Sequence, residues 1–395
     1  MTVKSLEKQY IINTYNRQPE ATLLLKRGEG VYVWDESGNR YLDFVSGLAV
    51  NNLGHCHPAV VEAINCQAQK LMHTSNLYYT EPQVRLAEAL VTHSSANKVF
   101  FCNSGAEANE AAIKLARKFG KQNRGEGAYE IITAERSFHG RTLAAVTATG
   151  QPKYHQGFEP MVSGFRYGKF NDLKSFETLI NENTCAILVE PVQGEGGIYP
   201  ATQEFLAGLR KLCDEHKLLL MFDEVQCGVG RTGKFLACEH YGVEPDVYTL
   251  AKALGGGLPI GAMGARGNAA DVLVPGDHAS TFGGNPVTCA AANAVLQAIL
   301  ADQFLPRVEQ LGHYFTEKLR ELDYPGIVEV RGLGLMIGLE INGDGAAVAK
   351  ACQEKGLLIN CIGGKILRFI PPLVVDEEQI DAAVTVVQQA LSALN

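Results

Sequence analysis

Several features that define whole classes of protein are missing from the sequence. There is no run of Lys or Arg, and 35 basic against 43 acidic residues give a formal net charge of −8. We therefore expect neither nucleic acid nor an anionic membrane surface as a partner. No apolar stretch reaches the roughly 18 residues that span a bilayer. Residues 1–15 lack the basic and then apolar layout of a signal peptide. A small anionic ligand could still bind through a few placed arginines.

Cysteines at metal-site or redox spacing are missing as well. The ten cysteines are scattered and no two form a C-x-x-C pair, which is typical of reduced, mostly buried thiols in a cytoplasmic protein. His55, Cys56 and His57 stand side by side. Neighbouring residues of an extended segment point to opposite sides, however, and no second ligand cluster follows. We therefore expect no metal site.

The order of apolar segments predicts an α/β protein with a large and a smaller unit. The chain has 395 residues, of which 46% are hydrophobic, and this is enough for both cores. After residue 98, short apolar runs alternate with helical stretches such as residues 106–120 and 204–217. That alternation is typical of a parallel sheet covered on both faces. The expected strands are residues 98–103, 129–134, 144–149, 185–190, 218–224 and 247–252.

The C-terminal part has the pattern of a separate α+β unit. Strands are expected at residues 330–341, 357–362 and 365–372, and helices at 345–356 and 376–394. Asp376 and Gln379 have the spacing of a capping box at the start of the last helix. Near the N-terminus, residues 30–44 predict a hairpin that turns at residues 36–39. We therefore expect three parts: an N-terminal segment, 1–50, that packs with the small domain; a large domain, 51–285; and a small domain, 286–395.

Ionisable residues end three of the expected strands. Glu190 follows one strand, Asp223 and Glu224 end the next, and Lys252 ends a third. Ligands bind outside the carboxyl ends of the strands of an open parallel sheet. Charges of both signs at neighbouring strand ends therefore favour a site, although structural ion pairs alone would explain them equally well.

A phosphate cradle is expected where a strand leads through Asn103, Ser104 and Gly105 into a helix. Free N–H groups and the helix dipole at such a start suit a phosphate, whereas a plain Ser cap is the simpler alternative. The sequence does not favour a nucleotide as the molecule that carries this phosphate. The stretch GVGRTG, residues 228–233, matches the residue patterns of two nucleotide-binding motifs. Phe235, however, stands where a P-loop needs Ser or Thr.

Pyridoxal 5'-phosphate fits a phosphate cradle beside a strand-end Asp and a strand-end Lys. Lys252 can form an imine with the cofactor's aldehyde. Asp223 can keep the ring nitrogen protonated, so that the ring withdraws electrons. Strand alternation places Val225 on the same side as Asp223, under the ring, and Phe138 is the candidate for the opposite face. Glycines 255–257 let the backbone approach the cofactor closely.

These residues lie in motifs that resemble the class III (subgroup II) aminotransferases of fold type I. The motifs cover essentially the whole chain and include NSGAEANEAAIKLAR, SFHGRT, EPVQGEGG, FDEVQCGVGRTGK, LAKALGGGLPIGAM, TFGGNP and LRFIPPL. The resemblance implies a large domain with a mostly parallel seven-stranded sheet and a smaller α+β domain. It also implies a homodimer with shared active sites.

By this resemblance, the terminal amino group of N2-acetyl-L-ornithine passes to 2-oxoglutarate in a ping-pong reaction. The products are N-acetyl-L-glutamate 5-semialdehyde and L-glutamate, in a step of arginine biosynthesis. The alternatives are ornithine, succinylornithine or succinyl-diaminopimelate as amino donor. An aminomutase would need no 2-oxoglutarate pocket, and a non-catalytic nucleotide binder would be colourless.

The resemblance also assigns the site residues. The cofactor-binding residues are Gly105, Ala106, Phe138, Asp223, Glu224, Val225, Gln226, Lys252 and, reaching the partner subunit's cofactor, Thr281. Lys252 and Asp223 are the catalytic pair.

The substrate-binding residues implied in the same way are Arg141, Ser280, Arg368, Glu195 and Tyr15. Arg141 takes a substrate carboxylate, with Ser280 nearby, and Arg368 takes the α-carboxylate of glutamate. Glu195 neutralises Arg368 when the other amino donor occupies the site. Tyr15 falls where relatives contact substrate.

Overall fold

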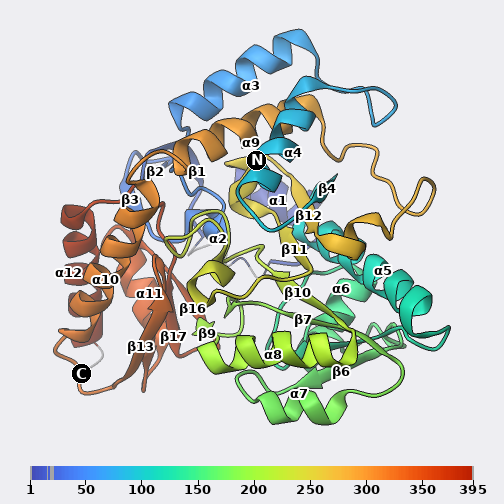
Figure 1. The fold of residues 1–395 in the computed structure, drawn as a ribbon. Helices are drawn as coiled ribbons and strands as arrows, with labels where there is room; N and C mark the ends of the chain where they lie inside the picture. The colour runs from blue at the N-terminus through green and yellow to red at the C-terminus, as the bar shows by residue number, and fades with distance from the viewer. Residues whose placement is uncertain (1, 16, 18–21, 394–395) are drawn as a thin grey trace.

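A seven-stranded sheet forms the centre of the molecule in the computed structural model, which describes residues 2–15, 17 and 22–393 (Figure 1). Its order is β4 (Lys98–Cys102), β12 (Gly261–Ala265), β11 (Val247–Leu250), β10 (Leu219–Asp223), β7 (Thr184–Val189), β5 (Glu130–Ala134) and β6 (Phe165–Gly168). The five strands from β11 to β6 are parallel. β12 is antiparallel to both β11 and β4. The expected mostly parallel α/β sheet is confirmed.

Helices cover both faces of this sheet because its strands are apolar on both sides. In β10, Leu219 and Met221 pack toward α5 (Gly105–Arg124) and α6 (Leu143–Ala148). Leu220 and Phe222 point to the opposite face. The helices on that face are α3 (Pro58–Lys70), α4 (Glu81–Thr92), α7 (Leu173–Leu179), α8 (Gln203–His216) and α9 (Pro286–Ile299). The alternation along β10 decides which way the residues at its end point.

Two smaller sheets bring the N-terminal and C-terminal parts together. One contains β1 (Leu25–Glu29), β2 (Tyr32–Asp35), β3 (Arg40–Asp43) and β15 (Leu357–Leu358), and the other β13 (Ile327–Leu333), β14 (Met336–Ile341), β17 (Ile366–Phe369) and β16 (Asn360–Ile362). The helices α10 (Phe304–Arg320), α11 (Gly345–Glu354) and α12 (Glu377–Ser392) lie beside them, at the left of Figure 1. Val31, Leu42 and Phe44 are buried in one core with these C-terminal elements. The capping box of Asp376 and Gln379 on α12 is confirmed.

Short elements connect these layers. They are α1 (Val3–Tyr10), α2 (Ser46–Ala49), β8 (Val192–Gln193) with β9 (Tyr199–Pro200), and the 3-10 turns η1 (Pro152–Tyr154), η2 (Ala237–Tyr241), η3 (Lys252–Gly255) and η4 (Gly267–Asp271). The β8–β9 pair is a small antiparallel hairpin. Its turn, residues 194–198, lies at the site described below.

Helix α9 belongs to the larger core by its contacts. It packs on α3 and α4, and its buried residues, among them Cys289 and Val295, lie in the same cluster as Leu220. We propose that the boundary between the two units falls after Ile299 and not at residues 285/286. Among the described residues no single helix is long and apolar enough to span a bilayer. α9 and α10 meet that criterion only as a pair, with a bend of 70° between them.

Three expected strands differ in the structure. Residues 144–149 were expected as a strand, but residues 143–148 form α6, because a short buried alanine-rich run satisfies either pattern. Residues 330–341 divide into β13 and β14 as a hairpin. Residues 357–362 divide between β15 and β16, in separate sheets. β12 was not expected, since its sequence GAMGA has little strand propensity.

Candidate active site

A cavity of about 470 Å³ opens at the carboxyl ends of β10 and β11, against the N-terminus of α5. Nine of the residues expected at the site line it. They are Gly105, Ala106, Phe138, Arg141, Glu195, Asp223, Val225, Gln226 and Lys252. Segments separated by more than a hundred residues along the chain therefore meet at one point, as the positions of these strand ends predict.

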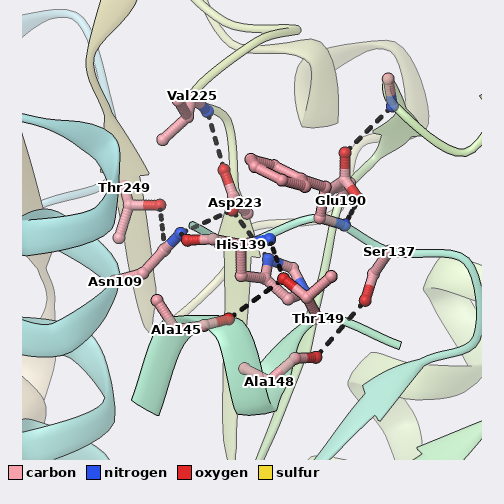
Figure 2. A network of polar contacts seen from close by, with 12 residues as sticks. Asn109, Ser137, His139, Ala145, Ala148, Thr149, Glu190, Asp223, Val225 and Thr249 are labelled. Atoms are coloured by element: carbon pink, nitrogen blue, oxygen red, sulfur yellow. Dashed lines mark hydrogen bonds and ion pairs between the residues drawn. The ribbon is translucent and has the colours of Figure 1, made fainter. Parts of the chain in front are cut away.

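Asp223 is the centre of a buried hydrogen-bond network (Figure 2). One carboxylate oxygen, Oδ1, accepts the backbone N–H of Val225 at 3.0 Å. The other, Oδ2, accepts the Asn109 side-chain amide at 2.7 Å and lies 2.8 Å from Nδ1 of His139. Three polar groups therefore surround a carboxyl that is 3% exposed and fix its orientation.

Sequence reasoning missed Asn109 and His139. Asn109 lies one turn into α5, and its Oδ1 accepts the hydroxyl of Thr249 at 2.8 Å. His139 directly follows Phe138 in SFHGRT, and its Nδ1 faces Asp223. The one available signal was that a fully buried helix face in AEANEAAIKLAR contains a polar Asn among alanines.

Lys252 follows β11 at the edge of the cavity. Its backbone has φ of 45°, a left-handed conformation that is uncommon for a residue with a side chain. Burial lowers the pKa of its amine, while Glu195 opposes that effect. A larger fraction of Nζ is therefore neutral and able to act as a nucleophile or base.

Glu190, at the end of β7, is 4% exposed. Its Oε1 accepts the backbone N–H of Phe138 at 2.9 Å, and its Oε2 accepts that of Gly194 at 3.0 Å. Burial raises the pKa of Glu190 to about 7. Of the strand-end charges noted in the sequence, this one serves to join two loops at the cavity.

Arg368 and Glu195 form a partly buried ion pair at the other side of the cavity. Arg368, on β17, is 1% exposed, and its Nη1 lies 2.5 Å from Oε1 of Glu195. Arg368 also donates to Gln226 at 3.3 Å and to Asn360 at 3.1 Å. Burial raises the pKa of Glu195, but the charge and hydrogen bond of Arg368 outweigh burial and lower it overall.

Arg141 lines the cavity from the opposite direction and is exposed to solvent. Its guanidinium stacks over the rings of Tyr154, at 3.9 Å, and Phe138, at 5.4 Å. No carboxylate of the described residues pairs with it in the ion pairs observed. Its charge is therefore available to a ligand. Ser280 accepts the Asn103 side-chain amide at 3.1 Å, close to the cradle.

Five expected site residues do not line this cavity: Arg368 and Ser280, which contact the lining residues Glu195 and Asn103, and Glu224, Thr281 and Tyr15. Glu224 requires a correction: its carboxylate points to the other face of the sheet and accepts the N–H groups of Ala237 and Cys238 at 2.9 and 2.8 Å. The cause is strand alternation, which separates it from Asp223. Thr281 is exposed. Tyr15 is 71% exposed, and the Arg17 guanidinium lies over its ring.

The residues present fit pyridoxal 5'-phosphate. Gly105 and Ala106 are the first two residues of α5, so their N–H groups have no partner within the helix and suit a phosphate. The buried Asp223 suits a protonated ring nitrogen, and the amine of Lys252 suits an aldehyde. Val225 and Phe138 both line the cavity beside them.

Comparison with known proteins agrees with this geometry. The family model of class-III aminotransferases matches residues 14–391. The acetylornithine aminotransferase of Caldanaerobacter subterraneus subsp. tengcongensis is 53% identical over 391 residues, 98% of each chain.

Solved structures agree as well. The acetylornithine aminotransferase of Elizabethkingia anophelis is 37% identical with a TM-score of 0.87, over 98% of each chain. The ornithine aminotransferase of Toxoplasma gondii is 33% identical with a TM-score of 0.94, over 100% of this chain and 96% of the other.

Proposed function

Because the chain belongs to the class-III aminotransferases, we propose that it transfers the terminal amino group of N2-acetyl-L-ornithine to 2-oxoglutarate. The products are N-acetyl-L-glutamate 5-semialdehyde and L-glutamate, a step of arginine biosynthesis. The observation that carries the proposal is a cavity lined by Lys252, Asp223 and the free Arg141, whose lining residue Glu195 pairs with a second arginine, Arg368. Relatives with this activity in their names match over nearly the full chain.

The cofactor is pyridoxal 5'-phosphate, which supplies an aldehyde that takes up the amino group and a ring that withdraws electrons from the reacting carbon. Lys252 would hold that aldehyde between turnovers, and its Nζ would be the base for the proton of the substrate's reacting carbon. Asp223 would hold a proton on the ring nitrogen. Gly105 and Ala106 bind the phosphate, and Phe138 and Val225 orient the ring and exclude water from its faces.

The two arginines divide the substrate carboxylates between them. Arg141 binds the carboxylate that is remote from the reacting amine, which acetylornithine and glutamate both have. Arg368 binds the carboxylate next to the reacting carbon, which glutamate alone presents there. Glu195 neutralises Arg368 when acetylornithine occupies the site, so that one cavity serves both halves of a ping-pong cycle.

We also propose a cytoplasmic homodimer. Leu77, Tyr78 and Tyr79 are 80%, 71% and 98% exposed in the single chain, and so large an apolar surface is typical of an interface. Thr281 lies outside the cavity of its own chain, as is required of a residue that reaches the partner subunit's phosphate.

The amino donor is tested by single-turnover half-reactions of the cofactor-loaded enzyme. Acetylornithine, succinylornithine, ornithine and succinyl-diaminopimelate are each mixed with it, and the change in cofactor absorbance is followed. We expect acetylornithine to give the highest second-order rate constant. A higher value for ornithine would replace the proposed donor. Absence of any visible absorbance after loading would contradict the cofactor.

A further inference from the structure

The turn that carries Glu195 is held more firmly than an exposed hairpin turn requires. This turn, residues 194–198 between β8 and β9, is called here the 194–198 loop. Glu195 pairs with Arg368 in the small unit, whereas the loop itself leaves the large sheet just after β7. Its backbone contacts show what can move when Glu195 and Arg368 separate.

Arg331, on β13 of the small unit, forms hydrogen bonds with the loop backbone. Its Nε donates to the carbonyl oxygens of Gly197 at 3.1 Å and Ile198 at 3.0 Å, and its Nη2 donates to Gly197 at 2.9 Å. Its Nη1 pairs with Glu329 and Glu340, both at 2.7 Å. Because the planar guanidinium is held at both ends and its residue is 7% exposed, it fixes two successive carbonyl groups.

Two further groups anchor the loop. Glu190 accepts the N–H of Gly194 at 3.0 Å, and with its other oxygen it holds Phe138 at 2.9 Å. Ile198 is completely buried and packs in a cluster with Met336 and Ile370 of the small unit. Each end of the loop is therefore fastened, one to the large sheet and the other to the small unit.

Three glycines of the loop pack closely against neighbouring groups. A Cβ at Gly194 would lie 2.2 Å from Oε1 of Gln226, one at Gly196 would lie 2.6 Å from the carbonyl oxygen of Arg136, and one at Gly197 would lie 2.6 Å from Ile366. Such approaches are possible only for glycine. Displacement of the loop toward these neighbours is therefore hindered, most of all at Gly196, where the neighbour is a backbone oxygen.

We infer that Arg331 is a positioning residue: it holds the backbone of the 194–198 loop in place while Glu195 and Arg368 separate. The inference rests on the proposed function, because it assumes that a substrate carboxylate displaces Glu195 from Arg368. It assigns Arg331, which lies outside the cavity, to the discrimination between the two amino donors.

A crystal structure of the cofactor-loaded enzyme with glutarate tests the motion directly. Glutarate has the two carboxylates of 2-oxoglutarate and no carbonyl group to react. We expect one carboxylate on Arg368, Glu195 rotated away, and the backbone of residues 194–198 within about 1 Å of its position without glutarate. A larger backbone shift overturns the inference and leaves the proposed function standing. Glutarate bound away from Arg368 overturns the proposed acceptor site and the inference with it.

Arg331→Lys tests the positioning role in solution. Lysine keeps the charge but cannot hold two carbonyls with a planar fork. Glu195 is then poorly held against Arg368, which leaves a positive charge facing the amine of acetylornithine. The glutamate half-reaction uses Arg368 without Glu195. We expect the ratio of kcat/KM for acetylornithine to that for glutamate to fall about tenfold, the size of one hydrogen bond to a charged group.

Arg136→Lys is the matched control. The guanidinium of Arg136 stacks on the ring of Tyr199 at 4.9 Å, and that of Arg331 does so at 4.0 Å. Among the described residues, no hydrogen bond from the Arg136 side chain to the loop is observed. The ratio should stay at the wild-type value in this variant. Equal loss of both half-reactions in Arg331→Lys, or an equal change of the ratio in Arg136→Lys, overturns the positioning role.

Discussion

The side-chain amide of Asn109 donates to the carboxylate of Asp223 at 2.7 Å and joins the first turns of α5 to the end of β10. The same nitrogen donates to the backbone carbonyl of His139 at 2.7 Å, and the Thr249 hydroxyl donates to Asn109 Oδ1 at 2.8 Å. A reversed amide would turn its oxygen toward two acceptors. The orientation of the Asn109 amide is therefore determined by its neighbours. Its NH₂ group connects Asp223 to the backbone of His139.

Removing this amide should weaken the site through Asp223. In Asn109→Ala we expect cofactor affinity and turnover to fall about tenfold to a hundredfold, since a hydrogen bond to a charged group is worth about 1.5–3 kcal/mol. Titration of the apoenzyme with pyridoxal phosphate, followed by absorbance, measures the affinity. Thr249→Ser keeps the hydroxyl and serves as the control. Wild-type affinity in Asn109→Ala would show that Asp223 needs no such support.

Lys252→Ala should abolish transamination and change the visible absorbance of the bound cofactor. The chain should still fold, because the lowered amine pKa and the left-handed φ of Lys252 indicate a residue that serves the reaction and not the packing of the core. Borohydride reduction of the wild-type enzyme, followed by peptide mass spectrometry, should place the cofactor on Lys252. Its attachment to another lysine would refute the assignment.

Asp223→Asn should act mainly on the catalytic rate. An amide cannot stabilise a proton on the ring nitrogen, and its NH₂ group would face the donors of Asn109 and His139. We expect kcat to fall at least about 100-fold, as for the loss of one preorganised electrostatic partner. Absorbance determines cofactor occupancy separately. Normal turnover at full occupancy would exclude this role.

Glu224 should make the stability of the protein depend on pH. Burial raises its pKa to about 7 in the folded protein, against about 4.3 in an unfolded chain. Between those values the folded state holds a proton that the unfolded state has lost. This contribution to stability is therefore complete at low pH and is lost as the pH rises toward about 7.

The variant Glu224→Gln lacks this titration. Its Tm relative to wild type should increase as the pH is raised from about 5 to about 8. Thermal unfolding of both proteins in a pH series measures the difference. Parallel curves over this range would mean that Glu224 is already ionised in the folded protein at low pH.

The sequence predicts best what depends on one strand end or one helix start. Asp223, Lys252 and Gly105 could be placed because parallel strands end at the same edge of a sheet. The opposite directions of Asp223 and Glu224 follow from the same strand alternation, yet the sequence does not show where the strand ends and the alternation stops. Once β10 is seen to end at Asp223, Glu224 belongs to the face of Phe222.

Two contacts between distant segments were not predicted from the sequence. Asn109 and Asp223 are 114 residues apart, and Arg331 and Gly197 are 134 apart. No local pattern connects either pair, because the first depends on how α5 packs on the sheet and the second on how the two units pack. The helix α6 was missed for a different reason: a run of six residues, four of them buried, is too short and too apolar to show a helical period.

Arg141 and Arg368 should separate the two half-reactions. Arg141 is unpaired among the described residues and serves the remote carboxylate of both substrates, so Arg141→Ala should slow both halves. Arg368 is buried against Glu195 at 2.5 Å and serves only the carboxylate next to the reacting carbon. Arg368→Ala should therefore damage the glutamate half far more, by about 2–5 kcal/mol in kcat/KM.

The same variant also leaves Glu195 without its partner, and a free carboxylate there attracts the amine of acetylornithine. The acetylornithine half should consequently be preserved or improved in Arg368→Ala. Single-turnover absorbance of each half-reaction, measured separately in both variants, gives the two ratios. Glu195→Gln is the complementary variant: it keeps Arg368 charged, so it should slow the acetylornithine half and spare the glutamate half. Equal damage to both halves in Arg368→Ala would make Arg368 a structural residue and remove the basis for the switch.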